Sequence, residues 1–144
     1  VARRWARTLC PGTGAAIELA PSGRKNIEEQ LTSLPEKYRF PIQHDVYGPQ
    51  KTPTCPTGMR GRMAAFEVLE MSSEIERIIL DNPVDSKLWA AARAQGMLTM
   101  REDAIVKAFN KSIPFSEVNT LSSLLLAGDE EVEAVGAPKA EATI

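Results

Sequence analysis

The stretch TGMRGRMAAFEVLEM, residues 57–71, is the strongest β-strand candidate in the sequence. Its glycines, Gly58 and Gly61, predict a structural turn that Arg62 closes, because glycine readily adopts the positive φ that other side chains resist. From residue 63 to residue 71, apolar residues recur at alternating positions, which is the period of a half-buried strand. The chain is therefore expected to turn at residues 58–62 and then to run as a strand.

Helical patterns follow this strand as far as residue 121. The first helix is capped by Ser72 or Ser73 and ended by Pro83, the second runs from Asp85 to Gly96, the third begins at Thr99 and ends before Pro114, and a short one begins at Ser116. Each start carries a capping residue and each stop a proline or glycine. Thr99 and Glu102 have the spacing of a capping box. After Gly128 the sequence is acidic and lacks aromatic residues, so 129–144 is predicted to be a disordered tail.

The sequence before residue 57 has weaker signals. Trp5 and Leu9 are four residues apart in 2–9, which predicts a helix there. Residues 11–25 contain repeated prolines and glycines and are expected to form a loop. A short helix is predicted from Asn26 through Leu34. Prolines recur from residue 38 to residue 58, so an extended, irregular segment is expected.

Composition limits the possible functions. The 144 residues carry a formal net charge of -2, which argues against a surface built to neutralise phosphates, so nucleic acid is not expected as a main partner. No stretch reaches the roughly 18 apolar residues of a membrane span, and a cytoplasmic location is expected. The two cysteines, Cys10 and Cys55, do not form a disulfide framework, and reduced thiols are the expectation for that compartment.

Motifs for nucleotide chemistry are missing from these 144 residues. Neither GxxxxGK[ST] nor GxGxxG occurs, and the glycines at 58 and 61 precede a strand instead of opening a helix. The single histidine, His44, has no GxSxG motif to serve as its nucleophile. No catalytic or cofactor-binding residue is therefore predicted, and this chain alone is expected to be inactive towards ATP.

Four segments in a fixed order resemble one protein family. They are RTLCP (7–11), TGMRGRMAAFEVLEM (57–71), QGMLTMRED (95–103) and SEV (116–118). Together they resemble the C-terminal portion of the type II secretion and type IV pilus-assembly ATPases, over about residues 1–121. The resemblance implies an α+β, mainly α fold: the C-terminal lobe of a RecA-like P-loop ATPase, with a short β element and a helical subdomain. It divides the chain into the end of the RecA-like core (1–10), a cysteine-bearing insertion (11–62), a strand with a helical subdomain (63–127) and the tail (128–144).

The resemblance also bears on metal binding. Members of the family usually carry two C-x-x-C pairs, a spacing that suits tetrahedral zinc. Here Thr13 stands where the partner of Cys10 would be, and Cys55 is alone near the second pair. Cys10 and Cys55, with His44 as a possible third ligand, make an incomplete site. This ligand count does not favour zinc.

As for function, the resemblance implies part of a cytoplasmic hexameric motor that works peripherally at the inner membrane. ATP and magnesium would belong to the full-length protein, whose phosphate loop lies upstream of the matched segments. This lobe would contribute to subunit packing and to coupling with an inner-membrane platform protein. An alternative is a stand-alone helical interaction module derived from such an ATPase. The choice between type II secretion, type IV pilus and competence systems stays open.

Overall fold

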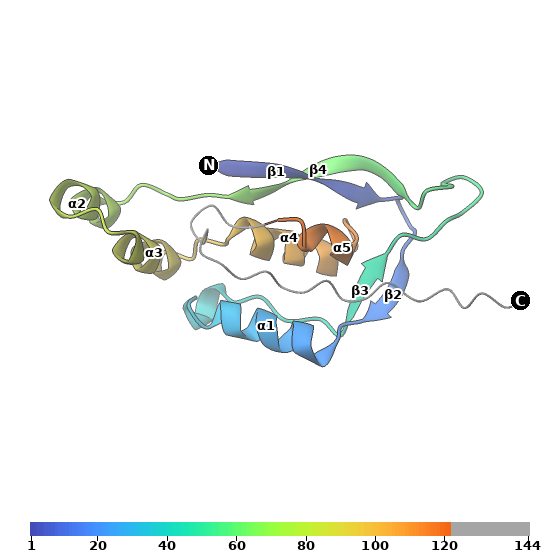
Figure 1. Ribbon diagram of the computed structural model, residues 1–144, viewed down its shortest axis with the longest axis horizontal. Coiled ribbons are helices and arrows are strands. Elements are labelled where there is room, and N and C mark those ends of the chain that lie inside the picture. Colours follow the sequence, from blue (N-terminus) through green and yellow to red (C-terminus); the bar gives the residue numbers. More distant parts are fainter. Residues whose placement is uncertain (122–144) are drawn as a thin grey trace, which may run out of the picture.

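The computed structural model describes residues 1–121, which form a mixed α/β structure (Figure 1). In chain order the elements are β1 (Ala2–Leu9), β2 (Ala15–Glu18), α1 (Pro21–Leu31), a 3-10 turn (Glu36–Tyr38), β3 (Asp45–Gly48), β4 (Met59–Glu67), α2 (Ser73–Asp81), α3 (Asp85–Ala94), α4 (Met100–Phe109) and α5 (Phe115–Val118). The α+β class with more helix than strand is thus confirmed for these residues. The predicted tail lies outside them.

β1 and β4 form a long antiparallel ribbon. Ala2 pairs with Glu67 at one end and Leu9 with Met59 at the other, with a register shift between Arg7 and Leu9. The predicted helix at 2–9 was therefore wrong. Local spacing suggested a helix, but pairing with a distant strand overrides such weak local preferences. The strand prediction for 63–71 was right in kind, although β4 begins at Met59 and ends at Glu67.

A second, shorter ribbon joins β2 to β3. Their antiparallel register runs from Ala15–Gly48 to Glu18–Asp45. Both strands fall in regions predicted to lack regular structure. β3 fits between the prolines at 41 and 49 because its four residues contain none, so all its backbone N–H groups remain. α1 begins at Pro21, five residues before the predicted start, since proline suits the first helical position.

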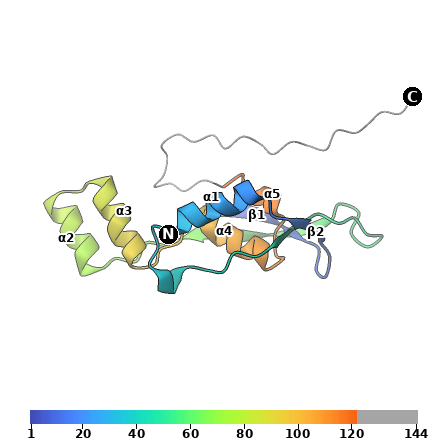
Figure 2. The same cartoon turned by 90° about the horizontal axis from the view of Figure 1, so that it is seen from below.

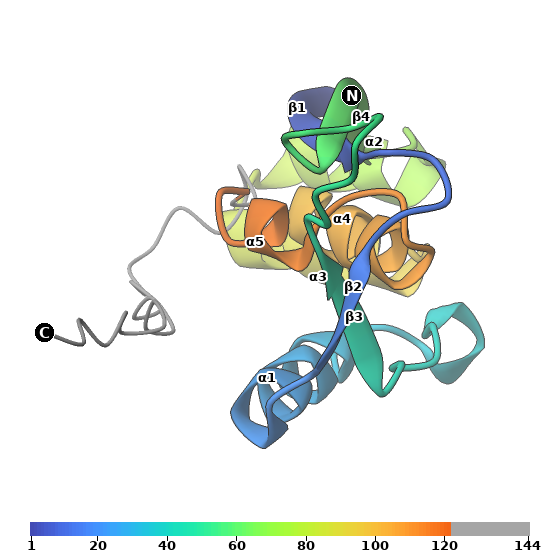
Figure 3. The same ribbon diagram turned by 90° about the vertical axis from the view of Figure 1, so that its right-hand side faces the viewer.

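The main core is layered around α4. Figure 3 shows the β1–β4 ribbon on one side of α4 and α5, and α1 on the other, with the β2–β3 ribbon running between these layers. Ala104, Ile105 and Ala108 of α4 are completely buried. Ala6 and Ala65 from the ribbon share their cluster. These small ribbon side chains allow α4 to approach the strands closely, so the ribbon and helix bury one continuous apolar surface.

α2 and α3 form a separate arm at one end of the molecule (Figure 2). Their own cluster contains Ile75, Ala91, Ala92 and Met97, and none of these residues belongs to the main core. The predicted helices that begin near Ser72, Asp85 and Thr99 are confirmed, with Ser72 accepting from the N–H of Ile75. The predicted cap at Asp85 was wrong, because Asp85 is the first residue of α3 and Val84 holds the N-cap position. Among residues 1–121, no helix has the length and apolar character needed to cross a membrane.

Candidate functional site

The most elaborate polar site in residues 1–121 is built on Arg93 of α3, whose side chain is 2% exposed. Its Nε donates to Ser33 Oγ at 2.8 Å, and its Nη1 to the carbonyl of Met97 at 2.7 Å. Its Nη2 donates to the carbonyl of Gln30 at 3.0 Å. The two remaining N–H groups meet Glu102, at 2.6 Å and 2.7 Å. All five guanidinium donors therefore have partners.

Glu102, in the first turn of α4, is the counter-charge of this site. Its carboxylate accepts both Arg93 bonds and also the backbone N–H of Thr99 at 2.9 Å. Thr99 Oγ1 in turn accepts from the N–H of Glu102, which completes the predicted capping box. A buried ion pair is tolerated only when the charges are paired and hydrogen-bonded, and this geometry meets both conditions.

These contacts join three helices that are separate in sequence. Arg93 comes from the arm and Glu102 from the core helix α4. Gln30 lies in the last turn of α1, and Ser33 follows two residues after the end of that helix. We call this set, with Met97, the helix joint. The Trp89 ring lies 5.2 Å from the Arg93 guanidinium carbon and shields one of its faces. The joint therefore ties the arm to the core.

A close contact supports the joint beside Arg93. Gly96 has φ +88°, and a Cβ built there would lie 2.7 Å from the ring of Tyr38. Tyr38 belongs to the 3-10 turn that follows α1. Only glycine allows this backbone conformation and this approach together. The segment after α1 thus packs directly on the end of α3.

Sequence reasoning missed Arg93. It identified Glu102 as a capping residue, whose charge favours a helix start, and that role is confirmed. The available signal was the position of Arg93, directly after the buried Ala91 and Ala92 in the same helix. A charged residue on the apolar side of a helix needs a buried partner, and the carboxylate nine positions later supplies it.

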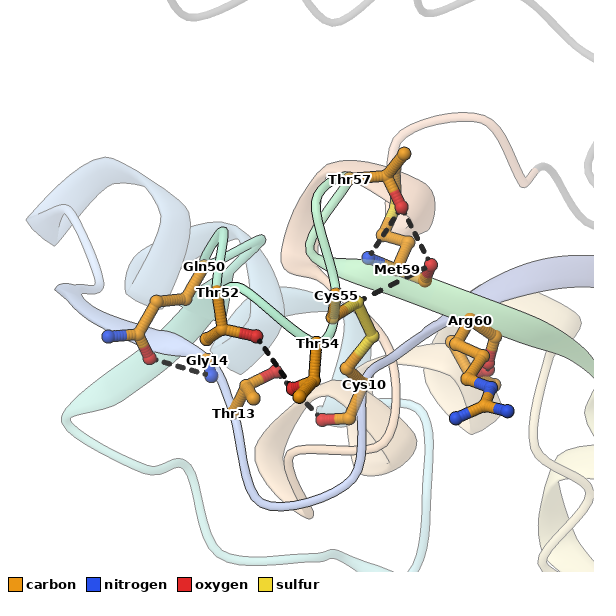
Figure 4. Close-up of a disulfide and its surroundings, with 11 residues drawn as sticks. Cys10, Thr13, Gly14, Gln50, Thr52, Thr54, Cys55, Thr57, Met59 and Arg60 are labelled. Atoms are coloured by element: carbon orange, nitrogen blue, oxygen red, sulfur yellow. Dashed lines mark hydrogen bonds between the residues drawn. A yellow bond between two sulfur atoms is a disulfide. The ribbon is translucent and has the colours of Figure 1, made fainter.

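The two cysteines named as possible metal ligands are bonded to each other (Figure 4). Cys10 and Cys55 form a disulfide with their Cα atoms 6.6 Å apart, so the expectation of two reduced thiols was wrong. The physical reason is the β1–β4 pairing, which brings the two segments together although 45 positions separate them. Residues 1–121 contain no group of three or more side chains placed to hold a metal.

The disulfide lies at the end of the β1–β4 ribbon, where the 11–58 segment leaves and returns. Cys10 N–H donates to the carbonyl of Gly58 at 3.3 Å, and Cys55 exchanges two backbone hydrogen bonds with Thr52. Thr13, whose side chain donates to the carbonyl of Cys10, stabilises the turn that follows. The disulfide thus links the two ends of the 11–58 segment, where it leaves β1 and returns to β4.

The predicted turn residues are separated in the structure. Gly58 has φ +74° in the turn before β4, and a Cβ there would lie 2.8 Å from the backbone nitrogen of Gln50. Gly61 has φ +86° but belongs to β4, as does Arg62, which is exposed and pairs across the ribbon with Arg7. Both glycines thus occupy conformations that disfavour other residues.

His44, considered as a further ligand, has acidic neighbours on the β2–β3 ribbon. Its Nδ1 is 2.8 Å from Asp45 Oδ1, and its Nε2 is 3.5 Å from Glu18 Oε1. The hydrogen bond and charge of Asp45, followed by the charge of Glu18, raise the pKa of His44 above its ordinary value. The ring is exposed, so its chemistry is that of a surface ion pair.

Sequence comparison identifies curated relatives. The chain is 34% identical over 100 residues to the type II secretion system protein E of Xanthomonas campestris pv. campestris, a match that covers 65% of this chain and 18% of that protein. It is 26% identical over 123 residues to the type IV pilus assembly ATPase PilB of Acinetobacter baylyi, covering 85% and 20%. PilB of Pseudomonas aeruginosa matches at 26% over 77 residues, covering 54% and 14%. No protein-family model matches the chain.

These names agree with the four ordered segments of the sequence. The matched proteins are secretion and pilus-assembly proteins, two of them described as ATPases. The chain spans about a fifth or less of the length of each of them. The resemblance is therefore confirmed: the chain is similar to type II secretion and type IV pilus-assembly proteins over a limited part of their length.

Proposed function

We propose that this chain is the C-terminal part of a cytoplasmic hexameric ATPase that powers type IV pilus assembly or type II secretion. Its role in that motor is subunit packing and mechanical coupling to an inner-membrane platform protein. The names of the relatives support the assignment to secretion or pilus assembly. The helix joint supports the role in mechanical coupling. ATP and magnesium would bind elsewhere in the longer protein.

The buried Arg93–Glu102 pair is the observation that carries the coupling role. The arm has its own small apolar cluster, so its main connections to the core besides the chain segments are the joint and the adjoining contact of Tyr38 with Gly96. Four hydrogen bonds from one side chain fix α3 against α4 and the end of α1, and a fifth reaches the carbonyl of Met97 just after α3. A rigid connection of this kind passes a displacement of one body to the other, because packed elements move as units.

The test is a substitution in the complete protein that carries this chain. Arg93→Met removes the guanidinium and keeps an apolar side chain of similar length. We expect ATP hydrolysis to be largely retained while pilus assembly or secretion falls at least tenfold. The matched control is Arg77→Met on α2, where the arginine is exposed, and it should leave both activities within about twofold.

The outcomes separate coupling from simple misfolding. If Arg93→Met abolishes hydrolysis and assembly together, the joint is needed for the integrity of the motor and the coupling role is wrong. If both activities persist, the joint is dispensable and the coupling role is again wrong. Glu102→Gln, a milder change that keeps one carbonyl acceptor, should give the same pattern at lower amplitude.

A further inference from the structure

The β1–β4 ribbon has an outer face that is both aromatic and basic. Trp5 is 60% exposed and Phe66 is 42% exposed. The register places Trp5 opposite Ala64 and Arg3 opposite Phe66, so these side chains share the face that points away from the core. The opposite face carries Ala6 and Ala65, which are buried. The outer face is therefore available to a partner.

Hydrogen bonds around the ribbon reveal which backbone groups point outward. Phe66 N–H donates to Asp103 Oδ2 at 2.8 Å, and Lys107 Nζ donates to the Ala64 carbonyl at 2.8 Å. On β1, Arg7 N–H donates to Glu117 Oε2 at 2.9 Å. In an antiparallel pair, every second residue pair turns its backbone groups away from the partner strand. The pairs Arg3–Phe66, Trp5–Ala64 and Arg7–Arg62 are of this outward kind.

The two edges of the ribbon are consequently covered to different extents. Side chains of α4 occupy the β4 edge at Phe66 and Ala64. The far part of the β1 edge is occupied at Arg7 by Glu117, and at Leu9 by the carbonyl of Ser112. Within residues 1–121, no hydrogen bond reaches the outward groups of Arg3 or Trp5. We call this part of β1 the open edge.

The positive charge of the ribbon determines which kind of partner can bind at the open edge. Arg3, Arg4, Arg60 and Arg62 lie along the ribbon, are exposed, and have no ion pair with any residue between 1 and 121. Arg7 is already neutralised by Glu117. A second copy of β1 is a poor occupant, because antiparallel pairing about Trp5 would set Arg3 against Arg7 of the other copy. Like charges facing each other across strands are destabilising.

We propose that the open edge at Arg3 and Trp5 binds an acidic, extended segment of a partner polypeptide by β-strand addition. The partner's backbone would pair with the outward groups of Arg3 and Trp5. Its apolar side chains would cover Trp5, and its carboxylates would face the ribbon arginines. Backbone pairing supplies affinity in such complexes, and the flanking side chains supply specificity.

The test uses a synthetic probe and the whole chain. A fluorescein-labelled ten-residue peptide of alternating glutamate and valine is titrated with the chain at low salt, and anisotropy reports binding. We expect saturable binding that weakens at least fivefold when four consecutive central residues of the peptide are N-methylated. A lysine–valine peptide should also bind at least fivefold more weakly. Arg3→Glu should weaken glutamate–valine binding at least fivefold, whereas the matched exposed control Arg77→Glu should change it less than twofold.

Other results overturn the proposal. The proposal is wrong if the glutamate–valine peptide does not bind at a millimolar concentration of the chain. It is also wrong if the peptide binds but N-methylation of the peptide, or Arg3→Glu in the chain, weakens this binding less than fivefold. Stronger binding of labelled oligothymidylate than of the acidic peptide would assign the ribbon to nucleic acid instead. Sedimentation equilibrium that shows a dimer of the chain at the titration concentration would assign the open edge to a second copy. Circular dichroism of each variant checks that the overall fold is retained.

Discussion

At the scale of single residues, Arg93 is the side chain on which most contacts converge. It is buried with Glu102, and four of its five donors connect α3 to α4 and to the end of α1. Removing one member of a buried ion pair leaves the other charge without compensation, which costs more than the pair itself contributes. Stability should therefore depend on Arg93 far more than on any exposed arginine.

Arg93→Met is expected to lower the free energy of unfolding by about 3–5 kcal/mol, because it leaves the Glu102 carboxylate buried and unpaired. Urea denaturation followed by circular dichroism measures this change. The same substitution at exposed Arg77 should cost less than about 0.5 kcal/mol. Equal effects at the two positions would show that the buried pair has no special role.

Two glycines with nearly the same positive φ provide a matched comparison. Gly12 has φ +73° and Gly58 has φ +74°, but a Cβ at Gly12 would meet nothing within 4 Å, whereas one at Gly58 would clash with Gln50 and Pro49. Gly12→Ala should cost about 1–2 kcal/mol from backbone strain alone. Gly58→Ala should cost about 1–3 kcal/mol more because of overpacking. Thermal denaturation of both variants checks the order, and equal losses would contradict it.

At the scale of elements, the Cys10–Cys55 disulfide fastens the 11–58 excursion to the β1–β4 ribbon. Closing a loop of this length should stabilise the fold by about 2–4 kcal/mol. Reduction with a phosphine is therefore expected to lower the free energy of unfolding by that amount. The Cys10→Ser, Cys55→Ser double variant should show the lowered value already and should not respond to the reductant. A response in that variant would mean that the effect does not come from this disulfide.

His44 makes the β2–β3 ribbon sensitive to pH. Its pKa is raised by Asp45 and Glu18, so folding favours the protonated ring. The added stability is fully present below the ordinary histidine pKa of about 6.5 and is lost as pH rises through the higher folded value. A proton NMR titration should find the His44 pKa above that of an unstructured histidine. Asp45→Asn should lower it, and an unchanged pKa in that variant would contradict the assigned cause.

The elements also show what local sequence can and cannot predict. The starts of α2 and α4 follow from Ser72 and Thr99, because helix capping depends on neighbours within four residues. β1 was predicted as a helix because its partner strand is more than 50 residues away, and single-sequence patterns carry no information about distant pairing. The pairing of Cys10 with Cys55 was missed for the same reason.

Of the two charged residues of the helix joint, only Glu102 was identified from the sequence. Glu102 was identified from its distance to Thr99, whereas Arg93 needed knowledge of three helices that meet only in the folded structure. Gly58 and Gly61 were selected for conformational freedom, and both have positive φ. Burial of a charged group is a tertiary property, so the position of Arg93 next to Ala91 and Ala92 was a signal for burial but could not identify its partners.

At the scale of the whole molecule, residues 1–121 form a layered core with a helical arm attached at the helix joint. The matched segments cover only 14–20% of the length of these relatives, and none of the phosphate-binding motifs occurs in the 144 residues. The proposed role, a lobe that moves with a motor, assigns ATP binding to another part of the protein. The purified chain should accordingly show no ATP hydrolysis above a buffer control.

The most direct test of this account is to sequence the coding region upstream of Val1. If the chain is the coupling lobe of a secretion or pilus-assembly motor, the same reading frame will contain a GxxxxGK[ST] phosphate loop upstream of Val1. A start codon close to Val1, with no phosphate loop in frame, would contradict the account. The chain would then be a stand-alone interaction module, with its partners still to be sought at the open edge and the arm.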